Sequence, residues 1–375
     1  MFEWMRSLGM KNGARRCRVF FVAVLLSQVA LGAQPVSVIF DTDMGNDVDD
    51  ALALAMLHAF ESRGEAKILA VTVTKGNAWS APFIDLVNTF YGRGGIPIGT
   101  VVNGKTPDSN PMIEGPASRK RPDGSCVYPH HITDGRQAPE AVAMLRKVLA
   151  AQHDGSVVII QVGFSTNLAR LLDSPADNVS PLAGKELVAH KVRLLSAMAG
   201  NFHSGAAEFN VEMDVPAAQK LFNQWPTPIV VSGFEVGSAL LFPASSIEND
   251  FAYVADHPIA EAYRNYMKMP YDRPTWDLTA ALYAIRRDRN YFSLSVPGKI
   301  SALGGGRTQF VPDGNGKHRY LILEDRQKAR ALEAMIMLAS EPPQQAQAAS
   351  TTMRRNSVRT SSAPTFQKVS LRSDR

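Results

Sequence analysis

Five aspartates lie within ten residues of this chain, where their carboxylates could bind a cation: Asp41, Asp43, Asp47, Asp49 and Asp50. Carboxylates crowded in this way repel one another, and they do not all ionise unless a cation lies among them. Hard divalent ions such as Ca²⁺ take several carboxylate and carbonyl oxygens as ligands. The spacing therefore predicts a calcium site. It is not of the EF-hand type, because the bidentate glutamate that ends an EF-hand loop is missing.

The aspartate loop stands between an expected strand and an expected helix. Residues 37–40 are apolar and partly β-branched, and residues 50–61 carry the apolar pattern of a helix. Gly45 permits a tight turn that brings the two ends of the loop together. Helix capping is the alternative explanation, since Asp at a helix start is favourable by about 0.3–1 kcal/mol. Capping accounts for one or two of these aspartates but not for all five.

The rest of the chain's body alternates between apolar runs and helical patterns. Runs that are apolar on both faces are typical of strands buried between helices. The alternation predicts an α/β fold, a single large domain with a mostly parallel central sheet flanked by helices. In open sheets of this kind, ligands bind outside the carboxyl ends of the strands. Further strands are expected at 68–73, 157–162, 192–198 and 229–231, and further helices at 82–92, 139–152 and 217–222.

Two segments depart from this alternation. The region 100–136 is rich in Pro, Gly, Asp and Ser, so it is expected to be irregular, either a functional loop or a disordered one. Near the end of the body, residues 309–311 and 320–323 flank the turn sequence Asp-Gly-Asn-Gly at 313–316. This pattern predicts a β-hairpin.

The two ends of the chain differ in composition from its body, which predicts three segments. In residues 1–33, three arginines precede the apolar run 19–31, and this pattern indicates a signal peptide. The chain is therefore expected to be exported, periplasmic or secreted, although an uncleaved membrane anchor is an alternative. Residues 34–341 form the expected folded domain. Residues 342–375, rich in Gln, Ala, Ser and Thr, form an expected disordered basic tail.

The basic character of the chain resides in these two ends. The whole sequence has a net charge of +5. Residues 1–33 carry +4 and residues 342–375 carry +5, so a net charge of −4 is left for the body. The basic isoelectric point is therefore no indication of a nucleic-acid surface, and nucleic acid is not an expected partner. Removal of the signal would leave Cys126 as the only cysteine, so no internal disulfide is expected.

Several motifs resemble those of one enzyme family. The segment 41–51 resembles the aspartate signature of the inosine-uridine-preferring nucleoside hydrolases, with two extra residues between Gly45 and the pair of aspartates that follows. Other resemblances follow in the family's order over most of residues 36–341. They are Lys75-Gly76-Asn77, Gly163-Phe164-Ser165-Thr166-Asn167-Leu168, Ala207-Glu208-Phe209-Asn210 and Trp276-Asp277.

The resemblance implies calcium-dependent hydrolysis of the N-glycosidic bond of ribonucleosides to free base and ribose. Such a reaction makes an oxocarbenium-like sugar, which fixed carboxylates and amides stabilise and which a metal-activated water attacks. The calcium ligands would correspond to Asp43, Asp50, the backbone carbonyl of Thr166, and Asp277. Asp43 is also the candidate general base, and Asp49 is expected to hold a ribose hydroxyl.

The resemblance also assigns residues to the substrate. Asn77, Glu208 and Asn210 are expected to hold the rest of the sugar, and Asn201 is the candidate for a further sugar-binding asparagine. Many family members place a histidine acid before the last metal aspartate, but this sequence has Trp276 there. It resembles in this the purine-preferring branch, where a tryptophan stacks on the base. Packing of this tryptophan in the core is the alternative, and His130 and His131 are further candidates for contact with the base.

Other functions fit part of the pattern. A haloacid-dehalogenase-like phosphatase also begins with a strand followed by Asp-x-Asp, but it uses Mg²⁺ and an aspartyl-phosphate. A non-catalytic, calcium-dependent sugar or nucleoside binder would need the same ligand residues. The family resemblance favours hydrolysis of a small-molecule nucleoside in purine salvage, by a possible homodimer or homotetramer. Once the predicted signal is cleaved, no stable membrane span is expected.

Overall fold

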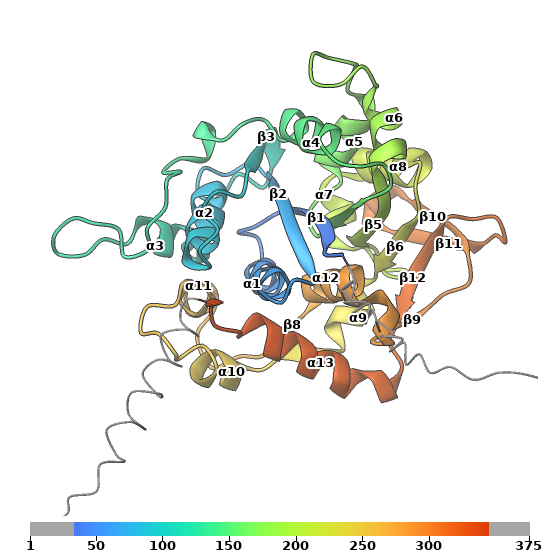
Figure 1. Ribbon diagram of the computed structural model, residues 1–375. Coiled ribbons are helices and arrows are strands. Elements are labelled where there is room, and N and C mark those ends of the chain that lie inside the picture. The colour runs from blue at the N-terminus through green and yellow to red at the C-terminus, as the bar shows by residue number, and fades with distance from the viewer. Residues whose placement is uncertain (1–33, 345–375) are drawn as a thin grey trace, which may run out of the picture. The chain divides into compact units, whose positions relative to one another are not determined.

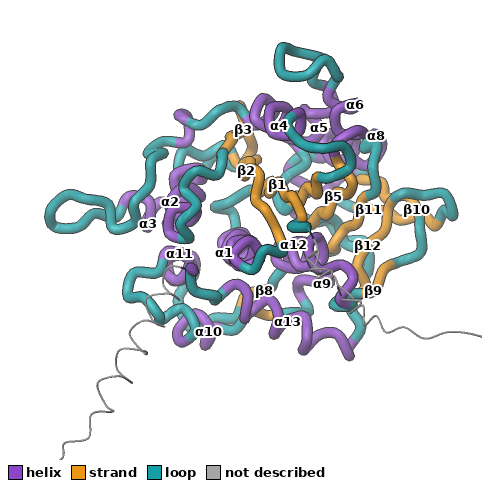
Figure 2. The backbone as a smooth tube through the Cα atoms, viewed as in Figure 1, coloured by secondary structure: helices purple, strands orange, loops and turns teal. Residues whose placement is uncertain are grey.

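Apolar strands and helices alternate along the body of the chain, and they assemble into one sheet flanked by helices (Figures 1 and 2). The computed structural model describes residues 34–344. The predicted signal segment and most of the predicted tail lie outside the described residues. Within them, the predicted α/β fold with a mostly parallel central sheet is confirmed.

The large sheet contains all of the expected strands and three strands that the sequence did not predict. The sheet consists of β1 (Val36–Thr42), β2 (Ala66–Lys75), β3 (Ile98–Lys105), β4 (Val157–Gln161), β5 (Val192–Met198), β6 (Ile229–Ser232), β9 (Ser293–Leu294), β10 (Gly298–Ala302), β11 (Thr308–Pro312) and β12 (His318–Ile322). The strands that the sequence did not predict are β3, β9 and β10. A separate two-stranded sheet joins β7 (Leu241–Phe242) to β8 (Arg273–Pro274).

The helices lie mostly between the strands in sequence, as the alternation predicts. They are α1 (Asp49–Ser62), α2 (Ser80–Phe90), α3 (Pro111–Ser118), α4 (Ala141–Ala150), α5 (Thr166–Asp173), α6 (Gly184–Lys191), α7 (Phe209–Met213), α8 (Val215–Gln224), α9 (Phe234–Ser238), α10 (Ala244–Asn249), α11 (Pro258–Tyr266), α12 (Trp276–Arg286) and α13 (Asp325–Ala339). Short 3-10 helices lie at Gly135–Gln137, Arg287–Arg289 and Gly304–Gly306.

The strand order places β1 inside the sheet, third from the β3 edge. The order is β11-β10-β12-β6-β5-β4-β1-β2-β3, and β1 pairs in parallel with both β2 and β4. The chain runs outward from β1 through β2 and β3, and then returns to the other side of β1 through β4, β5 and β6. This reversal leaves a crevice at the carboxyl end of β1, where ligands bind in sheets of this kind.

Alternate side chains of β1 enter two different cores. Val38 and Phe40 pack with apolar residues of α1 and α12, whereas Ile39 packs with those of α4, α5 and α8. The two groups of helices cover opposite faces of the sheet (Figure 1). Burial of each large apolar side chain contributes about 1.5–3 kcal/mol. The strands are thereby held in place, and with them the loops at their carboxyl ends.

The predicted hairpin around 313–316 is wrong. A turn does form there, because Gly316 N donates to Asp313 O at 2.9 Å. The strands that it joins, β11 and β12, lie on either side of β10, which pairs antiparallel with both. The physical reason is that β12 pairs in parallel with β6 and so extends the central sheet, while the true antiparallel neighbour of β11 is β10.

The region 100–136 is less irregular than predicted. Its first residues complete β3, and α3 follows at Pro111–Ser118. Asn110 caps α3 by accepting a hydrogen bond from the backbone N–H of Met112 at 3.0 Å, and Pro111 takes the first helical position. One proline of this region therefore begins a helix, and much of the rest of the region forms loops and turns.

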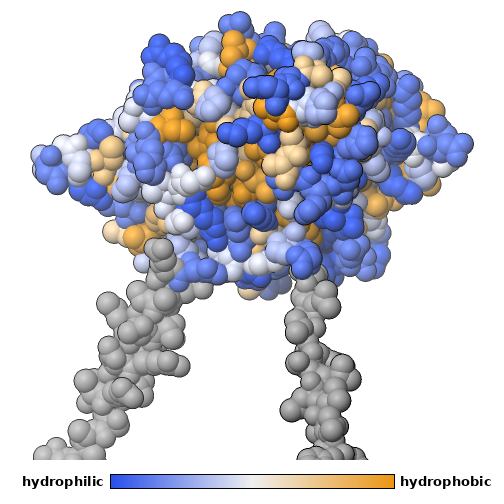
Figure 3. Space-filling model, turned by 45° about the horizontal axis from the view of Figure 1, so that its top comes forward, coloured by the Kyte–Doolittle hydropathy of each residue, from blue (hydrophilic) through white to orange (hydrophobic). Residues whose placement is uncertain are grey.

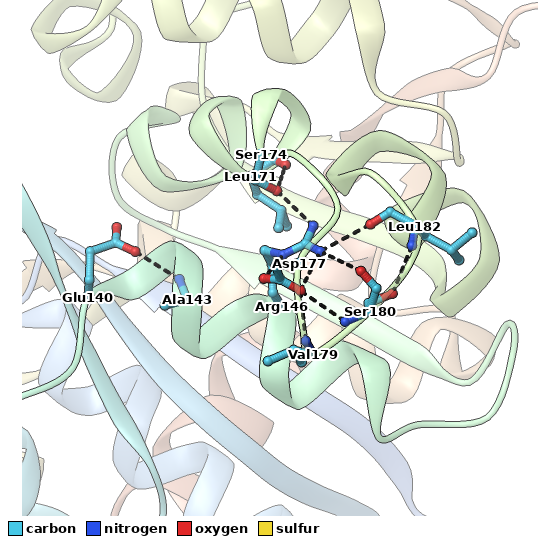
Figure 4. Close-up of polar contacts among 9 residues, drawn as sticks. All are labelled: Glu140, Ala143, Arg146, Leu171, Ser174, Asp177, Val179, Ser180 and Leu182. Atoms are coloured by element: carbon cyan, nitrogen blue, oxygen red, sulfur yellow. Dashed lines mark hydrogen bonds and ion pairs between the residues drawn. The ribbon is translucent and has the colours of Figure 1, made fainter.

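A buried arginine ties the connection between α5 and α6 to α4 (Figure 4). Arg146 donates to both carboxylate oxygens of Asp177, at 2.7 and 2.9 Å, and to Ser174 Oγ at 3.0 Å. It also donates to the backbone carbonyls of Ser180 and Leu182, at 3.2 and 3.1 Å. The hydrogen bonds from Arg146 hold the pKa of the Asp177 carboxyl well below its ordinary value. A loop without regular structure is thus fixed by one side chain.

The surface of the described residues is mostly hydrophilic on the face drawn in Figure 3, with a hydrophobic area near the middle of that face. None of the helices found within residues 34–344 is both long enough and apolar enough to cross a bilayer.

Candidate active site

The aspartate loop follows β1 directly, and two helix N-termini lie at its end. Asp49 and Asp50 are the first residues of α1, and Asp277 is the second residue of α12. All three are buried. Carboxylates at a helix N-terminus are favoured by the helix dipole and by its free N–H groups. Two helices from distant parts of the chain therefore supply one acidic cluster.

The three carboxylates form a group that could hold a metal ion. Oxygens of Asp49, Asp50 and Asp277 all lie within 4.8 Å of one another. The backbone N–H of Asp277 donates to Asp49 Oδ2 at 3.0 Å, and Thr42 Oγ1 donates to Asp50 Oδ1. The cluster is therefore held by hydrogen bonds that leave further carboxylate oxygens free.

The electrostatics of the cluster fit a divalent cation. Burial raises the pKa of Asp49, Asp50 and Asp277 well above the ordinary value, and the charges of neighbouring aspartates raise it further. Burial also raises the pKa of Asp43 to about 6, although a hydrogen bond from Asn46 opposes the change. A cation would relieve this repulsion, and carboxylate oxygens are the donors that Ca²⁺ prefers. The residues present thus fit the ion that the family resemblance implies.

A cavity of about 250 Å³ lies over the cluster. Seven of the ten predicted site residues line it: Asp43, Asp49, Asp50, Glu208, Asn210, Trp276 and Asp277. The remaining lining residues were not assigned from the sequence: Asn46, Asp47, Val162, Met198, Phe209, Phe234 and Arg273.

Glu208 and Asn210 lie on the wall of the cavity at the start of α7. Glu208 caps this helix and accepts hydrogen bonds from the backbone N–H groups of Gly200, Asn210 and Val211, at 2.9, 2.9 and 3.2 Å. Burial nevertheless raises the pKa of Glu208 to about 7. Asn210 Nδ2 donates to the carbonyl of Val162 at 2.7 Å, so the amide is oriented with its oxygen available for a ligand.

Three predicted site residues do not line this cavity. Asn77 donates to the carbonyls of Pro107 and Asp108, at 2.9 and 3.0 Å, and lines a neighbouring hollow. Asn201 Oδ1 accepts from two backbone N–H groups of its own loop, at 3.2 and 2.9 Å. Thr166 begins α5, and its Oγ1 donates to Asp214 Oδ2 at 2.6 Å. Their predicted contacts with sugar or metal stay predictions.

Asp43 is held by a chain of polar side chains that the sequence did not reveal. Buried Lys75 donates from Nζ to Asn46 Oδ1 at 2.8 Å and to the carbonyl of Thr106 at 2.6 Å. Because an ammonium group can only donate, Asn46 must direct its amide nitrogen elsewhere. Asn46 Nδ2 donates to Asp43 Oδ2 at 2.8 Å. The other oxygen of Asp43 therefore remains for a ligand or a water.

Aromatic side chains form the apolar part of the lining. The rings of Trp276 and Phe234 stack at a centroid distance of 5.3 Å and an interplanar angle of 28°. The indole N–H of Trp276 is bound to Phe234 O at 2.9 Å and to Ser238 Oγ at 3.0 Å. Phe234 and Phe209 are 40% and 46% exposed, so their faces are open to a ligand. Phe209 lies within the motif 207–210, and Phe234 follows the strand expected at 229–231. The sequence analysis assigned a role to neither of them.

An ion pair lies beside these aromatic rings. Arg273 Nε donates to Asp47 Oδ1 at 2.9 Å, Arg273 Nη2 donates to Asp47 Oδ2, and Nη2 also donates to the Tyr266 hydroxyl at 3.0 Å. Asp47 belongs to the stretch that carries the two residues extra to the family signature. The third aspartate of the loop is thus a partner of arginine. The sequence held only an indirect signal of this, because the loop has more aspartates than one metal ion needs.

Among residues 34–344, no histidine lines this cavity. His130 Nδ1 lies 2.7 Å from the carbonyl of Tyr128, and His131 Nδ1 lies 3.7 Å from Asp85 Oδ1. The site therefore combines a floor of buried carboxylates, a wall of polar groups and an aromatic rim. At the reversal point of a doubly wound sheet, such a combination is typical of an enzyme site whose acidic cluster suits a metal ion.

The comparison with protein families agrees with this class. The model of the inosine-uridine preferring nucleoside hydrolase family matches residues 38–354, and the chain belongs to this family. It is thus a hydrolase that acts on N-glycosyl compounds. The earlier resemblance of its motifs to this family is confirmed. None of the curated proteins matches the sequence significantly.

Solved structures share the fold at low sequence identity. The purine-preferring ribonucleoside hydrolase from Gardnerella vaginalis is 17% identical, with a TM-score of 0.61, over 81% of this chain and 98% of its own. The plant nucleoside hydrolase PpNRh1 is 20% identical, with a TM-score of 0.59, over 82% and 100%. The inosine-uridine preferring nucleoside hydrolase from Bacillus anthracis is 16% identical, with a TM-score of 0.58, over 81% and 99%.

Proposed function

We propose that this chain hydrolyses purine ribonucleosides to free base and ribose with Ca²⁺ as its metal ion. The observation that carries the proposal is the convergence of Asp49, Asp50 and Asp277, whose oxygens lie within 4.8 Å of one another beneath the cavity. We assign Asp43, Asp50 and Asp277 as calcium ligands, with the carbonyl of Thr166 as a further candidate. When bound, the ion supplies positive charge that orients the sugar hydroxyls and acidifies the attacking water.

The residues around this centre accept the proton of the water and bind the sugar. Asp43, with one oxygen held by Asn46, accepts the proton of the attacking water at its other oxygen. Asp49 holds a ribose hydroxyl from the floor, while Glu208 and Asn210 hold the sugar from the wall. These groups are fixed by hydrogen bonds before the substrate arrives. They therefore stabilise the positive charge of the sugar with little reorganisation.

The charge of the cavity favours a neutral nucleoside over a nucleotide. Six acidic side chains line it, and Arg273 is its single basic lining residue. A bound divalent ion offsets only part of this negative charge. A phosphate group would be repelled, whereas ribose hydroxyls can donate hydrogen bonds to carboxylates.

The aromatic rim supports a preference for purines. Trp276, Phe234 and Phe209 all line the cavity, and the larger purine ring gains more from stacking than a pyrimidine. Stacking is worth about 0.5–1.5 kcal/mol per aromatic pair. We therefore expect purine nucleosides to be hydrolysed roughly 2- to 10-fold faster in kcat/KM than uridine or cytidine.

A panel of five nucleosides tests the proposal. We expect the calcium-loaded protein to release reducing sugar from inosine, guanosine and adenosine, and EGTA to abolish the release. A non-catalytic calcium-dependent binder would bind the same compounds without turnover, so calorimetry on an inactive protein would identify that alternative. Absence of sugar release from every nucleoside in the panel would refute hydrolysis of ribonucleosides.

A variant at the cluster tests the metal assignment. Asp277→Asn removes one of three mutually repelling carboxylates. We expect it to weaken Ca²⁺ binding by at least about 100-fold in calorimetric titration. It should stabilise the metal-free fold by roughly 1–3 kcal/mol, because a repelling buried charge is gone. Asp173→Asn, at an exposed ion pair with Lys220, is the control that changes neither quantity. Unchanged calcium affinity in Asp277→Asn would contradict the site.

We further propose, from the composition of residues 1–33, that the protein is exported to the periplasm or secreted. A fusion of residues 1–33 to a reporter enzyme that is active only outside the cytoplasm tests this. The predicted homodimer or homotetramer stays a prediction, which sedimentation of the purified protein would decide.

A further inference from the structure

The cavity contains one cation whose hydrogen-bonding capacity is not used up. Arg273 engages Asp47 through Nε and Nη2, and Tyr266 through Nη2. Its third nitrogen, Nη1, donates to no residue between 34 and 344, and its side chain is 20% exposed. Arginine carries two N–H donors on this nitrogen. Arg273 lines the cavity, so these two donors are available to a ligand bound there.

The position of Arg273 is at the aromatic end of the cavity. Its guanidinium carbon lies 5.2 Å from the centre of the Trp276 ring and 5.0 Å from that of Tyr266. It is fixed by pairing of β8 with β7, three residues before the start of α12. The guanidinium of Arg273 thus lies beside the aromatic surface on which a purine would stack.

The other groups at this end offer no equivalent donor. The indole N–H of Trp276 is already bound to Phe234 O and Ser238 Oγ. Phe209 and Phe234 have no polar side-chain atoms, and no histidine lines the cavity in the described part of the chain. A departing base that needs stabilisation can obtain it from Arg273.

We propose that Arg273 is the residue that recognises the leaving base, and that its Nη1 group donates hydrogen bonds to acceptor atoms on the purine as the glycosidic bond breaks. This inference rests on the proposed function. The Nη1 amino group can donate to the N7 and O6 acceptors of a 6-oxopurine. Adenine offers only N7 as an acceptor on that edge, and its N6 amino group would face the donors of Nη1, so Arg273 also favours inosine and guanosine over adenosine.

The chemistry balances without proton transfer from arginine. The electron pair of the C–N bond goes to the base nitrogen, and water forms the new C–O bond at the sugar while losing a proton to Asp43. The hydrogen bonds from Nη1 disperse the negative charge on the departing base. Arginine keeps its proton, so the base takes one from solvent, and Asp43 returns one to solvent.

Asp47 makes this role possible. Burial opposes the charge of Arg273, but the hydrogen bonds and the charge of Asp47 outweigh it and keep the pKa of Arg273 above its ordinary value. The pair is neutral overall, so it does not turn the base site into an anion site. Asp47 also uses the Nε and Nη2 side of the fork, which leaves Nη1 for the ligand. Asp47 is thus a positioning residue.

The test compares two leaving groups on the calcium-loaded enzyme. Inosine has the N7 and O6 acceptors, whereas 4-nitrophenyl riboside lacks them and releases a phenolate that is stable without help. We expect Arg273→Met to lower kcat/KM for inosine by about 10- to 100-fold, and for the nitrophenyl riboside by less than about 3-fold. The Ca²⁺ dissociation constant of the variant should equal that of the wild type.

The chain offers a matched control. Arg286 also forms a bidentate ion pair, in which Nε and Nη2 donate to the two carboxylate oxygens of Glu65, each at 2.7 Å. Its guanidinium carbon lies 5.0 Å from the Phe60 ring centre, but Arg286 does not line the cavity. Arg286→Met should leave the ratio of the two rates unchanged. If Arg273→Met does not fold, Arg273→Lys takes its place. Its single ammonium group keeps the charge beside Asp47 but cannot also present a second nitrogen to the base as Nη1 does, so the same selective loss on inosine is expected.

The outcomes are distinguishable. An equal loss on both substrates, or no loss in either Arg273 variant, overturns the assignment of Arg273 and leaves the proposed function standing. Absence of turnover of every nucleoside by the wild-type protein overturns both.

Discussion

Glu208 illustrates how burial and hydrogen bonding compete at a single side chain. Three backbone N–H groups donate to its carboxylate and favour the charged form. Burial disfavours that form more strongly, and the pKa rises from 4.5 to about 7. In a metal-free protein, Glu208 is therefore half protonated near neutral pH. A positively charged sugar in the cavity would reverse this balance and favour the carboxylate.

A dependence of stability on pH follows from this pKa. Below about pH 4.5 the carboxyl is protonated in the folded and unfolded states, and its contribution to stability is fully present. Between about 4.5 and about 7 the unfolded chain releases the proton while the folded protein retains it, so stability falls as the pH rises. The loss amounts to about 3 kcal/mol for this one group. We expect Glu208→Gln to remove this part of the slope.

Urea denaturation of the metal-free protein at pH 5 and pH 7 measures this effect. Other buried carboxyls contribute to the slope of both proteins, so the difference between wild type and variant isolates Glu208. Identical slopes for wild type and Glu208→Gln would show that the folded protein holds Glu208 ionised.

At the scale of elements, the active site depends on loops that single side chains fix in place. The aspartate loop is supported by Lys75 through Asn46, and the connection between α5 and α6 is supported by Arg146. The carboxyl end of β4 also approaches the aspartate loop closely. A Cβ atom on Gly163 would lie 2.5 Å from Asp43 N, so only glycine permits this approach. The site is thus built on contacts between successive strand ends.

Removal of the Arg146 clamp should destabilise the fold without changing the chemistry. Arg146→Met leaves Asp177 without its partner and frees two backbone carbonyls. Asp177 is 35% exposed, so the cost comes mainly from the hydrogen bonds that the buried Arg146 gives up, and we expect a decrease of about 1–3 kcal/mol in the free energy of unfolding. Chemical denaturation measures it. Arg136→Met, at an ion pair whose arginine is 85% exposed, should leave the free energy of unfolding unchanged within experimental error.

The activity of the two variants completes this test. The clamp lies at the C-terminal end of α5 and none of its residues lines the cavity, so kcat for a nucleoside should remain within about 2-fold of the wild type in both variants. A large loss of kcat in folded Arg146→Met would instead mean that the α5–α6 connection controls the position of Thr166.

At the scale of the whole molecule, the reversal of strand order beside β1 brings distant segments together. Asp50 and Asp277 are 227 positions apart in the sequence. They meet because α1 follows β1 directly and because α12 packs against α1 on the same face of the sheet. A cavity at the carboxyl ends of the strands is the consequence. The domain as a whole, rather than any one segment, forms the metal site.

The division of the chain into domain and ends can be tested on the whole molecule. Residues 34–344 carry a net charge of −4, so a variant limited to them should bind an anion exchanger at neutral pH, unlike the basic full chain. We expect this variant to retain the kcat and the melting temperature of the longer protein, because the described fold lies within it. If the shortened protein loses nucleoside turnover, the predicted tail contributes to function.

Local sequence was sufficient to predict many of the strands and helices and half of the residues that line the cavity. Buried strands are recognisable because they are apolar on both faces, and β1, β2, β4, β5 and β6 all fall where such runs lie. Residues that act through their own type and place in a motif, such as Asp50, Glu208 and Asp277, were also found this way. They line the cavity because strand ends and helix starts converge at one edge of the sheet.

Pairing between distant segments was decided by the tertiary structure alone. The turn at 313–316 was visible in the sequence, but the insertion of β10 between β11 and β12 was not, because strand neighbours are chosen by packing across the whole sheet. Arg273 gave no local signal, since its partner Asp47 is 226 residues away. A motif records what a residue can do, whereas the partner that fixes its charge and direction depends on how the complete chain packs.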